Sequence, residues 1–158
     1  MPSQEGNKDC IFCRIARKEI PAEIIYEDKD FLAFLDINPN VDGMTLVMPK
    51  KHFDSYIFNM QDNEYCGLLK IAKKVAKMLD RALNVKRTAM IMEGLGVNHA
   101  HIKLYPIYGL EKDFQEIWAK ETVFFKEYRG YITTQLGPKA DPEHLKIIAG
   151  KIRNLLKH

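Results

Sequence analysis

The chain has 158 residues, of which 46% are hydrophobic and 28% charged, and its formal net charge is +3. This composition is typical of one globular domain with a single core; no apolar run reaches the roughly 18 residues of a membrane helix, and the charge is too small to favour nucleic-acid binding. The first residues are polar, without a signal-peptide core, and the three cysteines do not indicate a disulfide framework. We therefore expect a cytoplasmic protein with neither a membrane nor a nucleic-acid partner.

Short apolar runs bounded by polar turns predict five β-strands. In chain order they cover residues 24–26, 31–35, 44–48, 88–92 and 100–105. The first two flank the polar turn 27–30 and predict a hairpin, and the turn-forming loop 38–43 leads into the third strand.

Helical patterns surround these strands at residues 10–17, 62–83, 112–120 and 142–156. The longest has the best support, because its apolar residues recur at helical spacing along one stripe, namely Leu68, Ala72, Val75, Leu79 and Ala82. Hairpin strands, a long crossover helix and two further strands predict an α+β fold with an antiparallel sheet. We expect a disordered tail over 1–8 and one domain over 9–158, within which 121–158 form a C-terminal helical extension.

The segment from His99 to Tyr105 carries the most informative chemistry. Alternate side chains of a strand share a face, so His99, His101 and Lys103 would lie together, opposite an apolar face. A neutral imidazole is a good nucleophile toward phosphorus, and lysine can hold a phosphate oxygen. The glycines of the preceding run 94–96 would let backbone amides approach an anion. An amphipathic strand with one hydrated face would show the same alternation, and both interpretations stay open on the pattern alone.

Several blocks of the chain resemble the histidine triad (HIT) family. The run 98–106 resembles the family's His-φ-His-φ-His-φ-φ strand, and the runs 10–28, 31–39 and 43–52 resemble its other blocks in the same order. Together they span roughly residues 9–110. The resemblance implies a HIT-like fold, with an antiparallel sheet of about five strands, one long crossover helix and flanking helices, and a protein that pairs into a homodimer.

The resemblance also implies a nucleotide hydrolase or nucleotidyl transferase. His101, the middle histidine, would attack the α-phosphate of a nucleoside phosphoramidate, nucleotidyl ester or dinucleoside polyphosphate and form a covalent nucleotidyl-histidine, with Lys103 beside it. Asp36 would accept hydrogen bonds from the ribose hydroxyls of a purine nucleotide or nucleotide conjugate. The other residues that it assigns to nucleotide binding are Ile11, Phe12, Ile15, Phe34, Ile37, Gly96, Val97 and Asn98. For the apolar ones, plain core packing is the alternative.

A metal site is implied in the same way. Cys10 and Cys13 form a C-x-x-C pair, which alone can be redox-active, metal-binding or incidental. Some bacterial HIT proteins complete a zinc shell with histidines at the positions of His52 and His99, and both are present here. The resemblance therefore implies a structural zinc ion with four protein ligands and no open position. Two buried thiols and two ordinary histidines are the alternative.

The chain departs from the family pattern where a phosphate would be held. Lys103 replaces the third histidine, Met44 replaces a histidine in the third predicted strand, and the loop 92–97 is short and lacks the family's polar groups. Losing one oxyanion donor typically costs about 100- to 1000-fold in rate. A catalytically impaired nucleotide sensor on the same fold is therefore an alternative to the enzyme, and a zinc-stabilised interaction module without a nucleotide site is a third.

Overall fold

The computed structural model describes residues 7–134 and 137–155. Its described residues group into two compact units, one extending to Gln115 and the other beginning at Glu116. Most of the predicted tail 1–8 lies outside the described residues, and the prediction of one domain over 9–158 stays a prediction. None of the helices in the described part of the chain is both long and apolar enough to cross a membrane.

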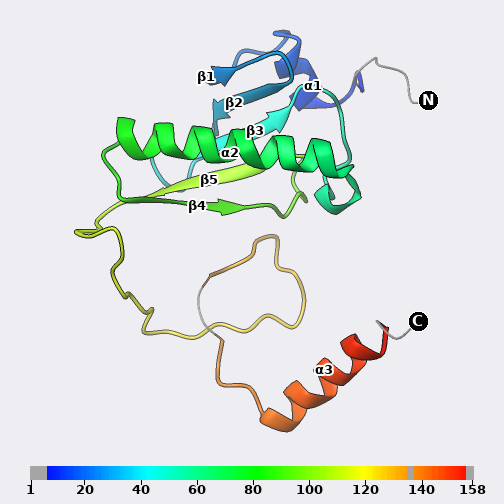
Figure 1. Ribbon diagram of the computed structural model, residues 1–158, viewed down its shortest axis with the longest axis vertical. Helices are drawn as coiled ribbons and strands as arrows, with labels where there is room; N and C mark the ends of the chain where they lie inside the picture. The colour runs from blue at the N-terminus through cyan, green and yellow to red at the C-terminus, as the bar shows by residue number, and fades with distance from the viewer. Residues whose placement is uncertain (1–6, 135–136, 156–158) are drawn as a thin grey trace. The chain divides into compact units, whose positions relative to one another are not determined.

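The first unit is built on a five-stranded antiparallel sheet with the order β1-β2-β3-β5-β4 (Figure 1). The strands are β1 (Ile24–Glu27), β2 (Phe31–Leu35), β3 (Thr45–Pro49), β4 (Arg87–Ile91) and β5 (Ile102–Ile107). In the centre of the sheet Leu35 pairs with Thr45, and Thr45 pairs with Leu104. The predicted α+β fold with about five antiparallel strands is confirmed.

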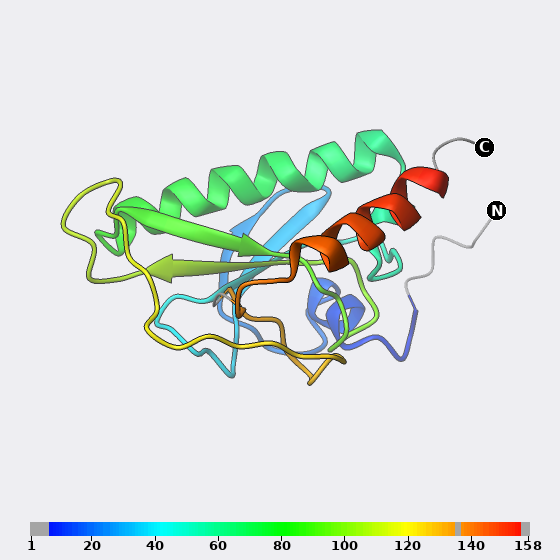
Figure 2. The same cartoon turned by 90° about the horizontal axis from the view of Figure 1, so that it is seen from below.

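Two helices cover opposite faces of this sheet (Figure 2). The long helix α2 (Asp62–Ala82) buries the predicted stripe, except Ala82, against alternate strand residues such as Val47 and Ile102. The short helix α1 (Ile11–Ala16) packs Phe12 on the other face, against the intervening residues of β2 and β3. Because strand side chains alternate between faces, two separate cores form on one sheet.

One predicted boundary is wrong in a way that matters for function. Strand β5 begins at Ile102 instead of residue 100, so His99 and His101 lie in the loop that precedes it. Here the amide of His99 donates to Val97 O (2.8 Å) and that of Ala100 donates to Phe53 O (2.9 Å). These bonds take the backbone groups that a longer strand would use in the sheet ladder.

The predicted helix over 112–120 is absent from the structure. The carbonyl of Asp113 accepts a hydrogen bond from the Arg87 guanidinium (2.9 Å), and the Glu111 amide donates to the side chain of Gln115 (3.2 Å). An isolated helix of this length is marginal in water, so these competing bonds decide the local structure. A 3₁₀ turn that was not predicted, η1 (Ile57–Asn59), precedes α2.

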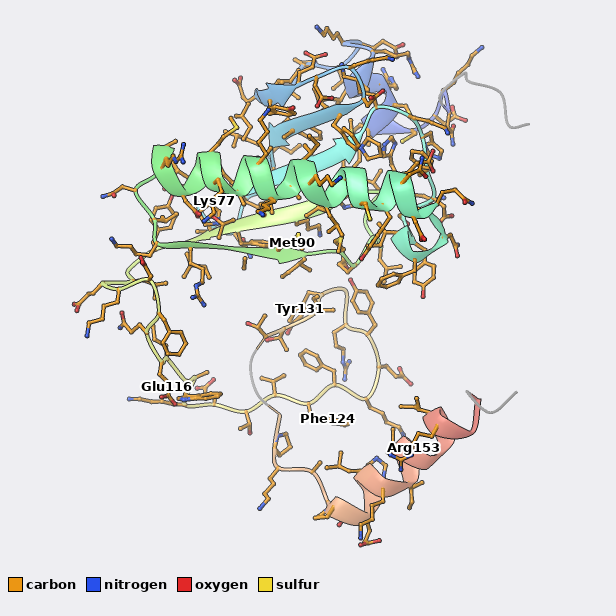
Figure 3. All side chains as sticks on the ribbon, viewed as in Figure 1. Lys77, Met90, Glu116, Phe124, Tyr131 and Arg153 are labelled. Carbon is orange, nitrogen blue, oxygen red and sulfur yellow. The ribbon has the colours of Figure 1, made fainter. Side chains whose placement is uncertain are left out.

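The second unit contains the helix α3 (Pro142–Leu155), close to the predicted 142–156. The preceding described residues from Glu116 form neither helix nor strand, and large apolar side chains in this segment, including Phe124 and Tyr131, are exposed (Figure 3). The rings of Phe125 and Tyr131 meet edge to face within the unit.

Candidate functional site

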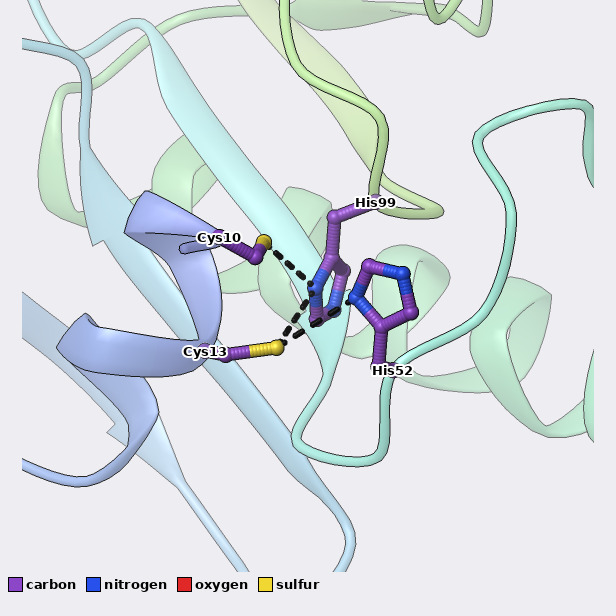
Figure 4. Close-up of side chains that lie close together, drawn as sticks. All are labelled: Cys10, Cys13, His52 and His99. Atoms are coloured by element: carbon purple, nitrogen blue, oxygen red, sulfur yellow. Dashed lines mark hydrogen bonds between the residues drawn. The ribbon is translucent and has the colours of Figure 1, made fainter. Parts of the chain in front are cut away.

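Four side chains from three separate segments meet on the α1 side of the sheet (Figure 4). Cys10 is the N-cap of α1, Cys13 lies one turn later, His52 follows β3, and His99 precedes β5. Their ligand atoms all lie within 4.8 Å of one another. The structure thus brings together the four residues that the sequence predicts as zinc ligands.

The geometry of this cluster fits a tetrahedral zinc ion. Zinc bonds of about 2.3 Å to sulfur and 2.0–2.1 Å to nitrogen place neighbouring ligand atoms about 3.5 Å apart in a tetrahedron. The Nδ1 atom of His99 lies 3.5 Å from both sulfurs, and His52 Nδ1 lies 3.3 Å from the Cys13 Sγ. Two thiols and two imidazoles at this spacing form a complete structural-type shell.

Protonation of the cluster also suits a metal. The Nε2 atom of His99 lies 2.8 Å from Pro49 O, and because a carbonyl only accepts, Nε2 carries the proton and Nδ1 offers its lone pair. Burial lowers the pKa of His99 to about 4, which keeps this imidazole neutral. Burial and the adjacent Cys10 thiol raise the pKa of Cys13 to about 11, so a metal must displace a proton to bind there.

His101 lies two residues from the metal cluster and is only 3% exposed. Its Nδ1 atom is 2.6 Å from His99 O, so Nδ1 donates a proton to that carbonyl and the Nε2 lone pair remains available. Burial lowers the pKa of His101, with a weaker opposing effect from the same hydrogen bond. The Phe12 ring stands edge to face against His101, 5.2 Å between ring centres. The result is a neutral, oriented imidazole.

Lys103 is held by a residue that the sequence interpretation missed. Its Nζ atom lies 3.0 Å from the Glu93 carboxylate, and the two side chains are only 23% and 13% exposed. Ile91 pairs directly with Lys103 across β4 and β5, so Glu93, two residues further on, follows on the same face. The sequence did offer one signal for this residue: Glu93 is an acidic residue in the loop where the family carries polar groups.

The residues predicted to bind a nucleotide are dispersed. Phe12, Ile15 and Phe34 are buried in the core under α1, whereas Ile11 is 44% and Ile37 87% exposed. Val97 packs partly against the same core. The structure therefore gives Phe12, Ile15 and Phe34 a core-packing role, and Phe12 in addition contacts His101.

Two side chains that are predicted to contact a nucleotide, Asp36 and Asn98, already accept hydrogen bonds from backbone amides. Asp36 accepts a hydrogen bond from the Asn38 amide (2.7 Å), and the Asn98 side-chain oxygen accepts one from the Ser55 amide (3.0 Å). Both side chains retain further polar atoms, and at Gly96 there is open space where a side chain would begin. Gly94, with φ of 72°, packs so closely on Ser55 that a Cβ would come within 2.6 Å of its carbonyl oxygen.

A separate cavity of about 440 Å³ contains none of the predicted site residues. It lies between the start of α2, the beginning of β2 and the loop after β3, and its lining combines three lysines with apolar side chains: Lys29, Lys50, Lys51, Phe31, Phe53 and Met60. The lysine charges are largely matched, because Lys50 pairs with Glu27 and Lys51 with Glu64. His101 does not line this cavity, so the predicted nucleophile lies outside it.

Comparison with known proteins places the chain in a family. The HIT domain model matches residues 17–108. The chain belongs to the HIT family. An uncharacterised HIT-like protein from Methanocaldococcus jannaschii is 43% identical over 103 residues, 63% of this chain and 79% of that protein. An adenosine 5'-monophosphoramidase from Saccharomyces cerevisiae is 34% identical over 119 residues, 74% of this chain and 75% of the yeast protein.

Solved HIT structures share the fold. The protein SMU.412c from Streptococcus mutans has a TM-score of 0.67 and 29% identity, covering 96% of this chain and 87% of that one. A zinc-bound histidine triad protein from Mycobacterium smegmatis has a TM-score of 0.61 and 28% identity, covering 66% of this chain and 78% of that one. These similarities, with the assembled Cys10, Cys13, His52 and His99 cluster, confirm the predicted zinc-containing, bacterial-type HIT branch.

Proposed function

We propose that this HIT protein is a nucleotide hydrolase or nucleotidyl transferase that uses His101 as its nucleophile. The observation that carries the proposal is the orientation of His101: its Nδ1 proton is held by His99 O, which leaves Nε2 to attack. The yeast adenosine 5'-monophosphoramidase among its relatives supports a nucleoside phosphoramidate as substrate. Nucleotidyl esters and dinucleoside polyphosphates are the other candidates.

The proposed reaction has two displacements. In the first, His101 Nε2 forms a bond to the α-phosphorus while the P–N or P–O bond to the leaving group breaks, and the leaving group takes up a proton from solvent. In the second, water attacks the nucleotidyl-histidine and gives up a proton to solvent, and the P–N bond to His101 breaks to release the nucleoside monophosphate. Backbone amides around Gly96, with Val97, Asn98 and Lys103, would contact the phosphate, and Asp36 the ribose.

We propose that zinc bound by Cys10, Cys13, His52 and His99 is structural. Four protein ligands would leave such an ion no open position for water or substrate, and bound zinc would cross-link the start of α1 to the loop after β3 and the loop before β5. Its contribution to catalysis would be to fix His99, whose carbonyl holds the His101 ring. A purine nucleotide partner, a homodimeric assembly and a cytoplasmic location belong to the same proposal.

Turnover of adenosine phosphoramidate tests the proposal. The wild-type protein should release adenosine monophosphate, and His101→Ala should lower the rate by about 1000-fold or more while the zinc content stays the same. The matched control is His144→Ala, an exposed histidine of α3, which should keep full activity. If wild type and His101→Ala release no nucleoside monophosphate from any of the three substrate classes, the enzyme proposal fails.

A nucleotide sensor without turnover is the second candidate. The observation that favours it is the Glu93–Lys103 ion pair, which occupies the ammonium group that would otherwise contact a phosphate. A sensor would bind adenosine monophosphate in calorimetry and leave every conjugate intact.

A further inference from the structure

We infer that the solvent face of α2 is a second binding surface, which holds the phosphodiester backbone of a double-stranded nucleic acid without reading its sequence. The surface is a basic stripe of five residues: Lys70, Lys73, Lys74, Lys77 and Arg81. Helix α2 packs on the face of the sheet opposite α1 and its metal cluster. The inference therefore goes beyond the proposed function and does not depend on it.

The positive charge of the chain is concentrated on α2 and the residues that follow it. Residues 65–87 contain seven lysines and arginines and one acidic residue, which gives a charge of +6. The whole chain carries +3, so the remaining residues together carry −3. The expectation that no nucleic acid binds used the net charge, which hides this uneven distribution. A basic stripe along one helix is the electrostatic signature of contact with nucleic-acid phosphates.

Helical spacing places the five cations of the stripe on one side of α2. They lie at i, i+3, i+4, i+7 and i+11, opposite the buried stripe from Leu68 to Leu79, and all five are exposed. Lys77 is labelled in Figure 3. From Lys70 to Arg81 the helix rises about 16 Å, a length over which one strand of a duplex presents about five phosphates. The stripe and a duplex strand therefore have similar charge densities.

The stripe is unfavourable for the helix by itself, because like charges four residues apart repel each other. It contains three such pairs: Lys70–Lys74, Lys73–Lys77 and Lys77–Arg81. Among the described residues, the one carboxylate that forms an ion pair with the stripe is that of Asp80, 3.5 Å from a Lys77 side chain that is 69% exposed. A bound polyanion would offset this repulsion, whereas the packing of the fold gains nothing from it.

The stripe adjoins a cavity of about 440 Å³ between α2 and the start of β4. The charged residues that line it are Lys73, Lys77, Lys86, Arg87, Asp80 and Asp113. Asp80 also accepts a hydrogen bond from the Thr88 hydroxyl (2.8 Å), and the Arg87 guanidinium donates to Asp113 O (2.9 Å). Four cations face two carboxylates, so a backbone phosphate that enters this cavity meets a surplus of positive charge.

The chemistry of the surface favours a duplex over other partners. Lysine is depleted in protein–protein interfaces, yet four of the five stripe residues are lysines. The apolar face of α2 is packed in the core, so the helix cannot lay it into a membrane surface. Single strands bind by stacking their bases on aromatic side chains, and residues 66–87 include none. Lysines alone suffice to hold duplex phosphates independently of sequence.

Fluorescence anisotropy with the full chain and a labelled duplex of about 20 base pairs tests the inference. Two duplexes of unrelated sequence should bind within about twofold of each other. The Kd should rise about 100-fold between 50 and 200 mM salt, as for a protein that contacts about four phosphates. DNA and RNA duplexes are compared in parallel, since both carry the phosphodiester backbone, and binding of either supports the inference. The separated single strands should bind more weakly.

Matched double variants locate the binding. Lys73→Gln with Lys77→Gln should weaken duplex binding by about tenfold or more at 50 mM salt and reduce the slope of log Kd against log salt by about two. Lys8→Gln with Lys29→Gln removes the same charge from exposed positions outside the stripe and should keep the Kd within about threefold of wild type. Glutamine is a good helix former and relieves the repulsion, so the melting temperature of the stripe variant should not fall.

Three outcomes would overturn the inference. They are no binding of either duplex at 50 mM salt, an equal loss of affinity in the two double variants, and tighter binding of single strands or of phosphatidylserine vesicles than of a duplex. Turnover separates this inference from the proposed function. His101→Ala should bind the duplex as tightly as wild type, and the stripe variant should keep full activity on adenosine phosphoramidate, so either claim can fail while the other stands.

Discussion

The metal cluster and the segment from His101 to Lys103 adjoin at His99, which is one of the four cluster residues, yet they differ in how much of the family pattern they keep. All four zinc ligands are present and their ligand atoms lie within 4.8 Å of one another. In the adjacent segment His101 is retained, but Lys103 stands where the third histidine is expected and is paired with Glu93. In this chain the metal scaffold of the site keeps the family pattern while the residues around the nucleophile depart from it.

The largest effect is expected from breaking the metal cluster. Cys13→Ala removes one ligand, and structural zinc binds with about 10–16 kcal/mol in small zinc domains, so its loss should lower the free energy of unfolding by on the order of 4 kcal/mol or more. Elemental analysis should show zinc falling from one ion per chain to none. Cys66→Ala, at an exposed cysteine, should keep both the zinc and the stability, and equal zinc content in the two variants would contradict the assigned ligands.

A smaller loss of stability is expected at Phe12, whose ring packs on both the metal ligand His99 and the proposed nucleophile His101. Phe12 stacks edge to face on His99 (5.9 Å) and on His101 (5.2 Å) while its side chain is buried under α1. Phe12→Ala should lower the free energy of unfolding by about 3–5 kcal/mol, as for other buried aromatic residues, and should reduce turnover through a mobile His101. Chemical denaturation measures the first effect, and unchanged stability would show that Phe12 is not a core residue.

The smallest loss of stability is expected from a substitution in the loop that carries Glu93. The backbone at Gly94 is left-handed, with φ of 72°, and an alanine there would have to adopt this conformation and place its Cβ within 2.6 Å of Ser55 O. Gly94→Ala should therefore lower the free energy of unfolding by about 2 kcal/mol. Gly96→Ala is the matched control, because open space surrounds its missing Cβ. Thermal unfolding should separate the two variants, and equal melting temperatures would mean that the loop adjusts freely.

Much of the fold follows from local patterns in the sequence. The stripe from Leu68 to Leu79 predicts α2 because its burial depends only on helical spacing. The zinc ligands were predictable only by resemblance, since no spacing rule joins Cys13 to His52 and His99, which lie 39 and 86 residues away. Long-range ligand sets depend on topology, which local periodicity does not encode.

The predictions that were wrong or incomplete share one physical origin. The helix expected at 112–120 yields to a hydrogen bond that Arg87, more than twenty residues earlier in the chain, donates to Asp113 O. Strand β5 starts late because Ala100 bonds to the distant Phe53. Glu93 was missed because its partnership with Lys103 depends on the register between β4 and β5. In each case a long-range hydrogen bond or ion pair overrides the local preference.

The central claim is that His101 becomes covalently nucleotidylated. The most direct test mixes the protein with adenosine phosphoramidate, stops the reaction in a single turnover, and maps the modified peptide by mass spectrometry. We predict an adenylyl group on His101 that forms and decays at rates compatible with turnover. Release of adenosine monophosphate without any adduct on His101, or with an adduct on another residue, would contradict the account.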